Sequence, residues 1–412
     1  MAFLLSIRQK RQSDPAAFLL PFRPATDIVE ADGLSVPRYT AEFWTSRQRA
    51  ASSLHEVSYR ACFKPALVRF FIDNLSHPGD RVYDPFAGRG TTALEAGLSG
   101  RMVASNDINP LSKILCRPRF ILPDPNALER RLASIPMRKG RRASIDLSMF
   151  YHKDTESEIV SLRAYLTGRK EQKREDPLDR WIRMVATNRL SGHSPGFFSV
   201  YTLPPNQSVT PERQLLINRR LHQRPEYRDT RNIILNKSRS LLSDVTREQY
   251  IALAVAGQSG KFLTTDARRT KSIAAESVTL TVTSPPFLNI VDYATDNWLR
   301  CWFNDIDARK IAGSITTTPS LDDWSAVMRG VYKELYRVTR PGGWVAFEVG
   351  EVRNKRLRLD EIIVPLGVSQ GFVSRAIVIN SQTFTKTSNI WGINNNQRGT
   401  NTNRIVLFEK AV

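Results

Sequence analysis

A glycine-rich turn between an apolar segment and a helical segment constrains the fold of this chain most strongly. Residues 81–84 predict a short buried strand, residues 88–90 a turn, residues 91–97 the start of a helix, and residues 101–107 the next strand. Two strands joined through one helix by short links favour a parallel sheet, because parallel neighbours need a crossover connection. We therefore expect an α/β fold that begins near residue 51.

The last third of the chain repeats this pattern. We expect a helix over residues 322–338 and a turn over residues 340–343. Strands are expected over residues 277–283, 344–349, 375–379 and 404–408. Together the two parts predict a doubly wound, mostly parallel sheet with functional loops at the carboxyl ends of its strands. Residues 119–260 lie between them and predict a basic, mainly helical insertion, and residues 1–50 an N-terminal arm.

The charge of the chain favours a polyanionic partner. Its 412 residues include 60 Lys and Arg but only 40 Asp and Glu, a formal net charge of +20. Residues 117–247 contain 26 Lys and Arg and 14 Asp and Glu, a net charge of +12. A third of the chain thus carries more than half of the excess, which is typical of nucleic-acid binding.

Other classes of protein are disfavoured. The cysteines Cys62, Cys116 and Cys301 are far apart and the five histidines are scattered, so neither a disulfide framework nor a metal site is expected. No apolar run approaches the roughly 20 residues that span a bilayer, and Arg8 interrupts the short apolar start of the chain. We expect a cytoplasmic protein without metal or membrane.

The glycine turn and the acidic residue after the second strand predict a nucleotide-type site. Gly88 and Gly90 would let the backbone approach a ligand, and Asp107 lies at the tip of the next strand. A carboxylate there can accept two hydrogen bonds from ribose hydroxyls. The alternatives are a tight turn without function and an Asp that caps a helix.

Two motifs together resemble those of a known family. The first is Asp84-Pro85-Phe86-Ala87-Gly88-Arg89-Gly90-Thr91, and the second is Ser284-Pro285-Pro286-Phe287. The pair is similar to the signature of the amino-methylating DNA methyltransferases, in particular the N4-cytosine type, which use S-adenosyl-L-methionine (AdoMet). The resemblance implies a Rossmann-like class I methyltransferase catalytic domain over residues 51–118 and 261–412.

The resemblance also implies a set of cofactor residues. Asn106-Asp107-Ile108-Asn109-Pro110 resembles the ribose motif, and the segment from Phe63 resembles the one that closes over the methionine moiety. Residues 263–267 resemble the family's Gly-Asp-Ala segment, with Thr265 in place of glycine. The residues expected to bind AdoMet are Lys64, Pro65, Asp84, Phe86, Gly88, Gly90, Thr91, Asp107, Asn109 and Asp266.

The second motif suits methylation of an exocyclic amino group. The N4 nitrogen of cytosine is a poor nucleophile because its lone pair is conjugated with the ring. Hydrogen bonds from N4–H to the Ser284 oxygen and the Pro285 carbonyl would draw it towards tetrahedral geometry, and two prolines stiffen the loop. Phe287 can stack on a base that has left the helix. The expected catalytic residues are Ser284, Pro285, Pro286 and Phe287.

The insertion lies between the two motifs, as a target-recognition domain does in one arrangement of the family. It contains charge runs suited to phosphates and a segment rich in glycine and aromatic residues, followed by Arg, Asn and Gln, which read base edges. The alternative for this segment is an ordinary loop packed on the core. The expected DNA-binding residues are Arg141, Arg142, His193, Phe197, Tyr201, Asn206, Gln207, Arg219 and Arg220.

Three functions remain open from the sequence. The first is a DNA methyltransferase that modifies cytosine N4 in double-stranded DNA, with a cognate restriction endonuclease as a possible partner. The second keeps the reaction but changes the target to adenine N6 or to RNA; Ser284 in place of Asp or Asn favours cytosine. The third is a non-catalytic DNA-binding protein on a methyltransferase scaffold, which the intact motifs disfavour.

Overall fold

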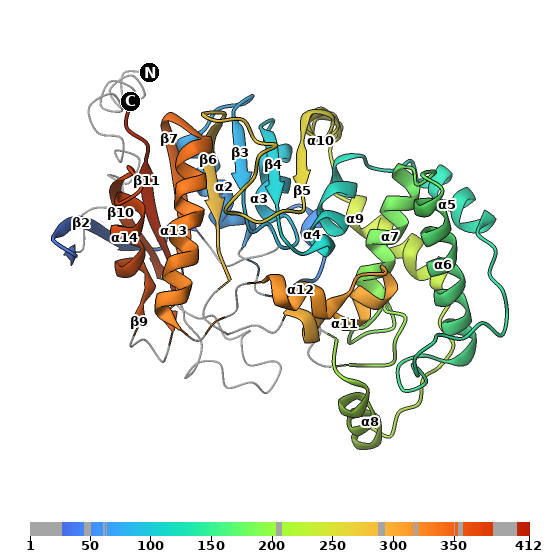
Figure 1. Cartoon of the computed structure of the whole chain (residues 1–412). Coiled ribbons are helices and arrows are strands. Elements are labelled where there is room, and N and C mark those ends of the chain that lie inside the picture. Colours follow the sequence, from blue (N-terminus) through green and yellow to red (C-terminus); the bar gives the residue numbers. More distant parts are fainter. Residues whose placement is uncertain are drawn as a thin grey trace.

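The computed structural model describes residues 27–44, 51–60, 62, 64–202, 208–286, 293–315, 318, 320–349, 351–352, 357–381 and 402–412. Within these ranges the chain forms a nine-stranded sheet with helices on both faces and a helical region beyond the β5 edge (Figure 1). The doubly wound, mostly parallel sheet with a helical insertion that the sequence predicts is confirmed.

The strands follow the order β1-β2-β10-β11-β7-β6-β3-β4-β5. β3 is parallel to β4 and β6, β4 to β5, and β6 to β7, whereas β11 is antiparallel to both its neighbours. An antiparallel β1–β2 hairpin, not anticipated within residues 1–50, extends the sheet beyond β10. The bounds are β1 (Asp27–Ala31), β2 (Leu34–Ala41), β3 (Arg81–Asp84), β4 (Met102–Asn106), β5 (Lys261–Leu263), β6 (Val278–Thr283), β7 (Thr339–Val349), β10 (Val373–Ser381) and β11 (Thr402–Glu409), with β8 (Glu351–Val352) and β9 (Leu357–Arg358) paired separately.

The strand order reverses between β3 and β6. From β3 the chain runs outward through β4 to β5, and it then returns to β6 on the other side of β3. Such a reversal opens a crevice at the carboxyl ends of the strands, where ligands bind in open α/β sheets. The loops that follow Asp84, Asn106 and Thr283 therefore meet at one edge of the sheet.

Each face of the sheet has its own helical layer. α2 (Pro65–Leu75), α3 (Thr91–Leu98) and α10 (Arg247–Ser259) share one core cluster with residues such as Val82. α13 (Leu321–Val338) and α14 (Leu359–Val368) share a second cluster with residues such as Tyr83. Neighbouring strand residues enter opposite clusters because side chains alternate along a strand.

The turn expected over residues 340–343 is wrong as a separate element. Strand β7 runs without interruption from Thr339 to Val349. Its register against β6 shifts, since Val278 pairs with Thr339 whereas Leu280 pairs with Trp344. The intervening residues form a bulge, a turn-like irregularity within the strand.

The helical region consists of consecutive helices, most of which begin at a side-chain cap. Asp176 and Thr246 each form a capping box, which satisfies free N–H groups of the first turn. The last helix, α10, packs against α3 and β4 and leads into β5. The boundaries predicted for the inserted domain, residues 119–260, stay a prediction.

The helices not yet named are η3 (Ser53–His55), α4 (Pro110–Cys116), η4 (Arg117–Phe120), α5 (Pro125–Ser134), α6 (Lys153–Glu171), α7 (Pro177–Arg189), α8 (Pro211–Arg220) and α9 (Thr230–Leu242), with α11 (Tyr293–Phe303) and α12 (Ala308–Ser314) after β6.

Two features are absent from the described ranges. None of their helices is long and apolar enough to cross a membrane. Nor do these ranges bring together three or more His, Cys, Asp or Glu side chains that could hold a metal ion.

Candidate active site

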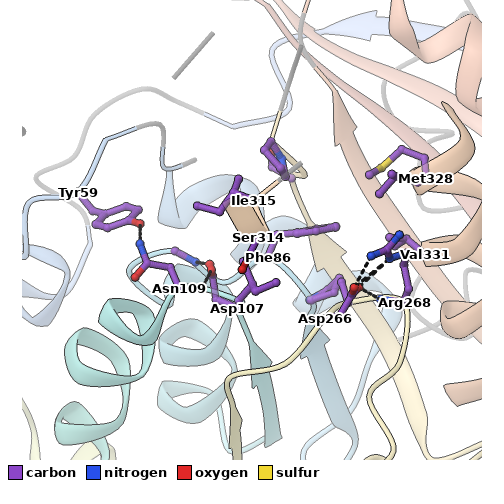
Figure 2. Close-up of a pocket in the computed structure, with 17 residues that line it drawn as sticks. Tyr59, Phe86, Asp107, Asn109, Asp266, Arg268, Ser314, Ile315, Met328 and Val331 are labelled. Atoms are coloured by element: carbon purple, nitrogen blue, oxygen red, sulfur yellow. Dashed lines mark hydrogen bonds and ion pairs between the residues drawn. The ribbon is translucent and has the colours of Figure 1, made fainter. Parts of the chain in front are cut away.

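A pocket lies at the carboxyl ends of β3, β4, β5 and β6, where the strand order reverses. It encloses about 800 Å³, part of which is open to solvent. The lining residues that Figure 2 draws come from the loops after these strands, from α12 and α13, and from the segment before α2. They include Tyr59, Phe86, Gly88, Asp107, Ile108, Asn109, Asp266, Arg268, Ser284, Pro286, Ser314, Ile315, Met328 and Val331.

Two hydrogen bonds hold the glycine loop against the end of β4. The Gly88 N–H donates to Asp107 Oδ2 at 2.8 Å, and the Ala87 N–H donates to the Asn106 carbonyl at 2.9 Å. Gly88 lines the pocket with φ +52°, a left-handed conformation that favours glycine. Gly90 also has a left-handed φ of +81°. In addition, a Cβ there would lie 2.4 Å from Cys116 Sγ, so glycine lets the start of α3 approach the end of α4 closely.

Asp107 presents a carboxylate to the pocket. Besides Gly88, the Asn109 N–H donates to this group, at 2.9 Å from Oδ1. Burial raises the pKa of Asp107 to about 6 in spite of these two donors. The group is therefore mostly ionised at neutral pH, and each oxygen keeps lone pairs for a ligand.

Asn109 caps α4 and also lines the pocket. Its Oδ1 accepts the Leu111 N–H at 3.0 Å, and its Nδ2 donates to the Tyr59 hydroxyl at 3.4 Å. This contact places Tyr59, which sequence reasoning missed, on one side of the pocket (Figure 2). The sequence before the expected methionine segment carried no signal for it.

Asp266 lies on the opposite side of the pocket (Figure 2). Arg268 contacts its carboxylate at 2.5 Å and lowers the pKa of Asp266. The segment is held in place by Asn106, which donates to the Thr265 carbonyl at 3.0 Å and accepts the Thr265 N–H at 3.1 Å. Arg268 was not singled out from the sequence, and Asn106 was named only as the first residue of the segment that resembles the ribose motif.

The other residues expected to bind the cofactor do not line this pocket. Asp84 is fully buried and accepts hydrogen bonds from the Thr283 hydroxyl at 2.6 Å and the Phe86 N–H at 3.0 Å. Burial raises the pKa of Asp84 to about 7. Pro65 and Thr91 are buried at the starts of α2 and α3, and Lys64 precedes α2. Their contact with a cofactor stays a prediction.

The Ser-Pro-Pro loop enters the pocket from the end of β6. Ser284 and Pro286 line it, while Pro285 is buried behind them and Phe287 lies outside the described residues. The Trp324 indole N–H of α13 donates to the Pro286 carbonyl at 3.0 Å. This bond anchors the loop against the helix layer.

A buried glutamate next to this loop was missed by sequence reasoning. Glu348 lies near the carboxyl end of β7, beside β6. The Asn403 amide donates to Glu348 Oε1 at 2.5 Å, and the Ser284 side chain also hydrogen-bonds the carboxylate. Burial raises the pKa of Glu348 to about 7 despite both bonds. An acidic residue inside an apolar strand was the signal that could have identified it.

The residues expected to bind DNA have different environments. Phe197 is buried, with the Arg189 guanidinium 3.8 Å from its ring centroid, which corresponds to the alternative of a loop packed on the core. Arg142 pairs with Glu156 at 2.7 Å. Arg219 and Arg220 are exposed at the end of α8, which projects from the helical region (Figure 1). Arg141, His193 and Tyr201 are partly exposed, and Asn206 and Gln207 lie outside the described residues.

Comparison with known proteins gives one match to a family. Residues 27–113 match the model of the N6/N4 methyltransferases, described as DNA methylase. This segment runs from β1 into α4 and includes the glycine loop and Asp107. No curated protein matches the chain.

Several solved methyltransferase structures are similar to this chain at low levels. A Thermus thermophilus protein assigned as a DNA modification methylase is 22% identical over 36% of this chain and 51% of its own, with a TM-score of 0.22. TrmN of Thermus thermophilus is 14% identical over 88% of this chain and 52% of its own (TM-score 0.31). The chain thus spans about half the length of each. The rRNA methyltransferase AviRa of Streptomyces viridochromogenes is 12% identical over 95% of this chain and 96% of its own (TM-score 0.33).

Proposed function

We propose that this protein is an AdoMet-dependent DNA methyltransferase that modifies the N4 amino group of cytosine. The observation that carries the proposal is that Asp107, at the end of β4, and Ser284, at the end of β6, line the same pocket. The first residue suits a ribose and the second suits an amino group, so a cofactor and a base could meet between them. The DNA methylase match over residues 27–113 supports this assignment.

The residues of the pocket fit AdoMet. Asp107 offers an ionised acceptor for the ribose hydroxyls, and Gly88 lets the backbone approach the cofactor closely. Phe86, Ile108 and Met328 provide apolar walls. When bound, AdoMet supplies an electrophilic methyl group on its sulfonium. Asp266 would contact the adenine side of the cofactor, with its orientation set by Arg268.

Ser284 would prepare the target amino group. When the Ser284 hydroxyl donates to Glu348, its oxygen lone pairs are free to accept a hydrogen bond from cytosine N4–H. The Pro285 carbonyl would accept the second N4–H. These acceptors would draw the nitrogen lone pair out of conjugation and towards the methyl group. The bond from the methyl group to N4 would form as the bond to the sulfonium breaks, and the nitrogen would release one proton to solvent, which leaves a neutral N4-methylated base.

Double-stranded DNA is the proposed substrate because the chain is positively charged and because the pocket suits methylation of a cytosine amino group. The chain has a net charge of +20, and Arg219 and Arg220 are exposed on the projecting α8. A paired cytosine cannot reach the pocket, so the base must leave the helix. A cognate restriction endonuclease is the partner that such a modification activity could serve.

The test is incubation with labelled AdoMet and unmethylated genomic DNA, followed by mass spectrometry of nucleosides. We expect N4-methylcytosine, and we expect Ser284→Ala to lose the product while it still binds AdoMet. N6-methyladenine would contradict the choice of base but not the reaction. A product in RNA alone would contradict the choice of nucleic acid, and no AdoMet binding would overturn the proposal.

A further inference from the structure

A second pocket lies next to the first, between α4, η4, the α6–α7 junction and the segment after β5. It encloses about 790 Å³, part of it open to solvent. α4 begins directly after Asn109, and Thr264 is two residues before Asp266, so two of its walls continue into the candidate active site. Its charged lining residues are Lys113, Arg117, Lys170, Arg180, Arg183 and the single acid Glu175.

The one acid of this pocket is already paired. Glu175 Oε1 accepts from Arg183 at 2.8 Å, and Arg180 donates to the Glu175 carbonyl at 2.9 Å. Lys113, Arg117 and Lys170 have no ion pair or side-chain hydrogen bond with any residue of the described ranges. All three are exposed, although the surrounding protein partly desolvates Lys113 and Arg117.

Three acidic residues next to the pocket are paired as well. Asp176 and Asp179 bind Arg131 and Arg169 at 2.6–3.1 Å. Asp305, next to the lining residue Ile306, pairs with Arg163 and accepts the Thr167 hydroxyl. None of these carboxylates contacts the three unpaired cations.

The cations of the pocket repel one another. Burial, and then Arg117, lowers the pKa of Lys113. Burial, and then Arg180, lowers the pKa of Arg117, with Glu175 acting in the opposite direction. Like charges gathered in a concave site attract an anion, which would relieve their repulsion. Because Arg and Lys together suit phosphate oxygens, a phosphate is the anion that this geometry favours.

We propose that this pocket holds a backbone phosphate of the DNA substrate, next to the Asn109 and Asp266 side of the candidate active site. The proposal rests on the proposed function and adds a contact that fixes the strand relative to the active site. Phosphate contacts set position and orientation without reading sequence. We therefore expect this subsite to act equally on all sequences, unlike residues that contact base edges.

The test compares two variants with the same reduction in charge. The pocket variant is Lys113→Gln/Arg117→Gln/Lys170→Gln, and the control is Lys153→Gln/Arg130→Gln/Lys333→Gln, three exposed cations on α6, α5 and α13 that line neither pocket. Binding of a duplex oligonucleotide is measured between about 50 and 200 mM salt, together with AdoMet binding. The single variants Lys113→Gln and Lys170→Gln repeat the test if the triple variant is unfolded.

The expected result is a shallower salt dependence in the pocket variant alone. The slope of log K against log salt should fall by about 0.9 for each phosphate that the variant no longer neutralises. Affinity should fall about tenfold or more at low salt, while AdoMet binding is unchanged. An unchanged slope in a folded pocket variant would overturn the subsite while the wild-type activity on DNA stands.

Two other outcomes would also overturn it. Wild-type protein that binds AdoMet but no DNA at low salt would overturn the proposed function together with the subsite. Stabilisation of wild-type but not pocket-variant protein by inorganic phosphate, at matched ionic strength and with unchanged DNA binding, would identify a site for a free anion instead.

Discussion

The hydroxyl of Thr283 donates a 2.6 Å hydrogen bond to Asp84 inside the sheet. Thr283 immediately precedes Ser284, and Asp84 immediately precedes the loop that contains Gly88. The bond therefore joins the glycine loop after β3 to the Ser-Pro-Pro loop after β6, which are far apart in the sequence. Since both loops contribute to one pocket, their relative position depends on it.

Thr283→Val should weaken both stability and catalysis. Val keeps the shape but removes the donor, so the buried Asp84 carboxyl keeps the Phe86 N–H and loses one hydrogen bond, at a cost of about 1–3 kcal/mol. We expect a lower melting temperature and a lower kcat, with AdoMet affinity less affected, because Ser284 is the nearer neighbour. Thr283→Ser retains the hydroxyl and is the control. A Val variant as stable as wild type would show that the bond does not hold the loops.

AdoMet affinity should depend on the ionisation of Asp107. Only the carboxylate can accept from both ribose hydroxyls while it also holds Gly88 and Asn109, and burial raises its pKa to about 6. Affinity should therefore be full above pH 7 and fall as pH drops through 6. Calorimetry between pH 5 and 8 measures this.

Asp107→Asn should bind AdoMet about tenfold or more weakly, in line with hydrogen bonds to a charged group, and should lose the pH dependence. Asp73→Asn, an exposed carboxylate of α2, is the matched control. If the pH dependence persists in Asp107→Asn, another group is responsible for it.

Methyl transfer should increase with pH through about 7. The ionised Glu348 accepts the Ser284 hydroxyl, whereas the protonated form can donate to Ser284 and compete for its lone pair. At saturating AdoMet, the wild-type kcat should therefore rise as Glu348 ionises. Glu348→Gln should be slower, with a flatter profile over this range. An identical profile in the variant would separate Glu348 from the chemistry.

The same residue should lower stability at high pH. The pKa of Glu348 rises from 4.5 to about 7 on folding, so the folded state retains the proton more strongly. The part of the free energy of unfolding that comes from this raised pKa is fully present below pH 4.5. It is lost as the pH rises to 7, and the loss is about 3 kcal/mol at 1.36 kcal/mol per pKa unit. The melting temperature of Glu348→Gln relative to wild type should therefore be higher at pH 8 than at pH 5, as a thermal melt would show.

Gly90→Ala should destabilise more than Gly140→Ala. Both glycines have positive φ, +81° and +77°. Alanine is strained in this left-handed conformation, so each variant should lose about 1–2 kcal/mol of stability from this cause. Only at Gly90 would the new Cβ meet Cys116, which adds about 1–3 kcal/mol of overpacking. Cys116→Ala in the Gly90→Ala background should restore part of the stability by removing the sulfur. Equal melting temperatures for the two glycine variants would contradict this.

The sequence predicted the parts of the site that follow from strand order. Asp107 and Ser284 could be expected to meet because the carboxyl ends of parallel strands lie at one edge of a sheet. The sequence could not show that Asp84, also at a strand end, is buried, because a carboxylate there can face the interior or the pocket. The orientation of Asp84 depends on Thr283, whose hydroxyl donates a hydrogen bond to the Asp84 carboxyl inside the sheet.

Contacts between distant elements were beyond sequence reasoning for the same reason. Glu348 is close to Ser284 only because β7 pairs with β6 in a particular register. Trp324 anchors Pro286 because α13 covers that end of the sheet. Phe197 was predicted to bind DNA, with a loop packed on the core as the alternative. It is buried with the Arg189 guanidinium over its ring, a packing choice that local composition does not encode.

The connection from β4 to β5 has a consequence for how the protein is made. β5 pairs with β4 at the edge of the sheet, and the helical region fills the chain between them, with α10 returning to pack on α3. A ribosome must therefore synthesise that region before the hydrogen-bonding edge of β4 can be covered. A nascent chain halted earlier would expose this edge, a surface prone to aggregation. Because Asp266 follows β5, the candidate active site is completed only after the helices have emerged.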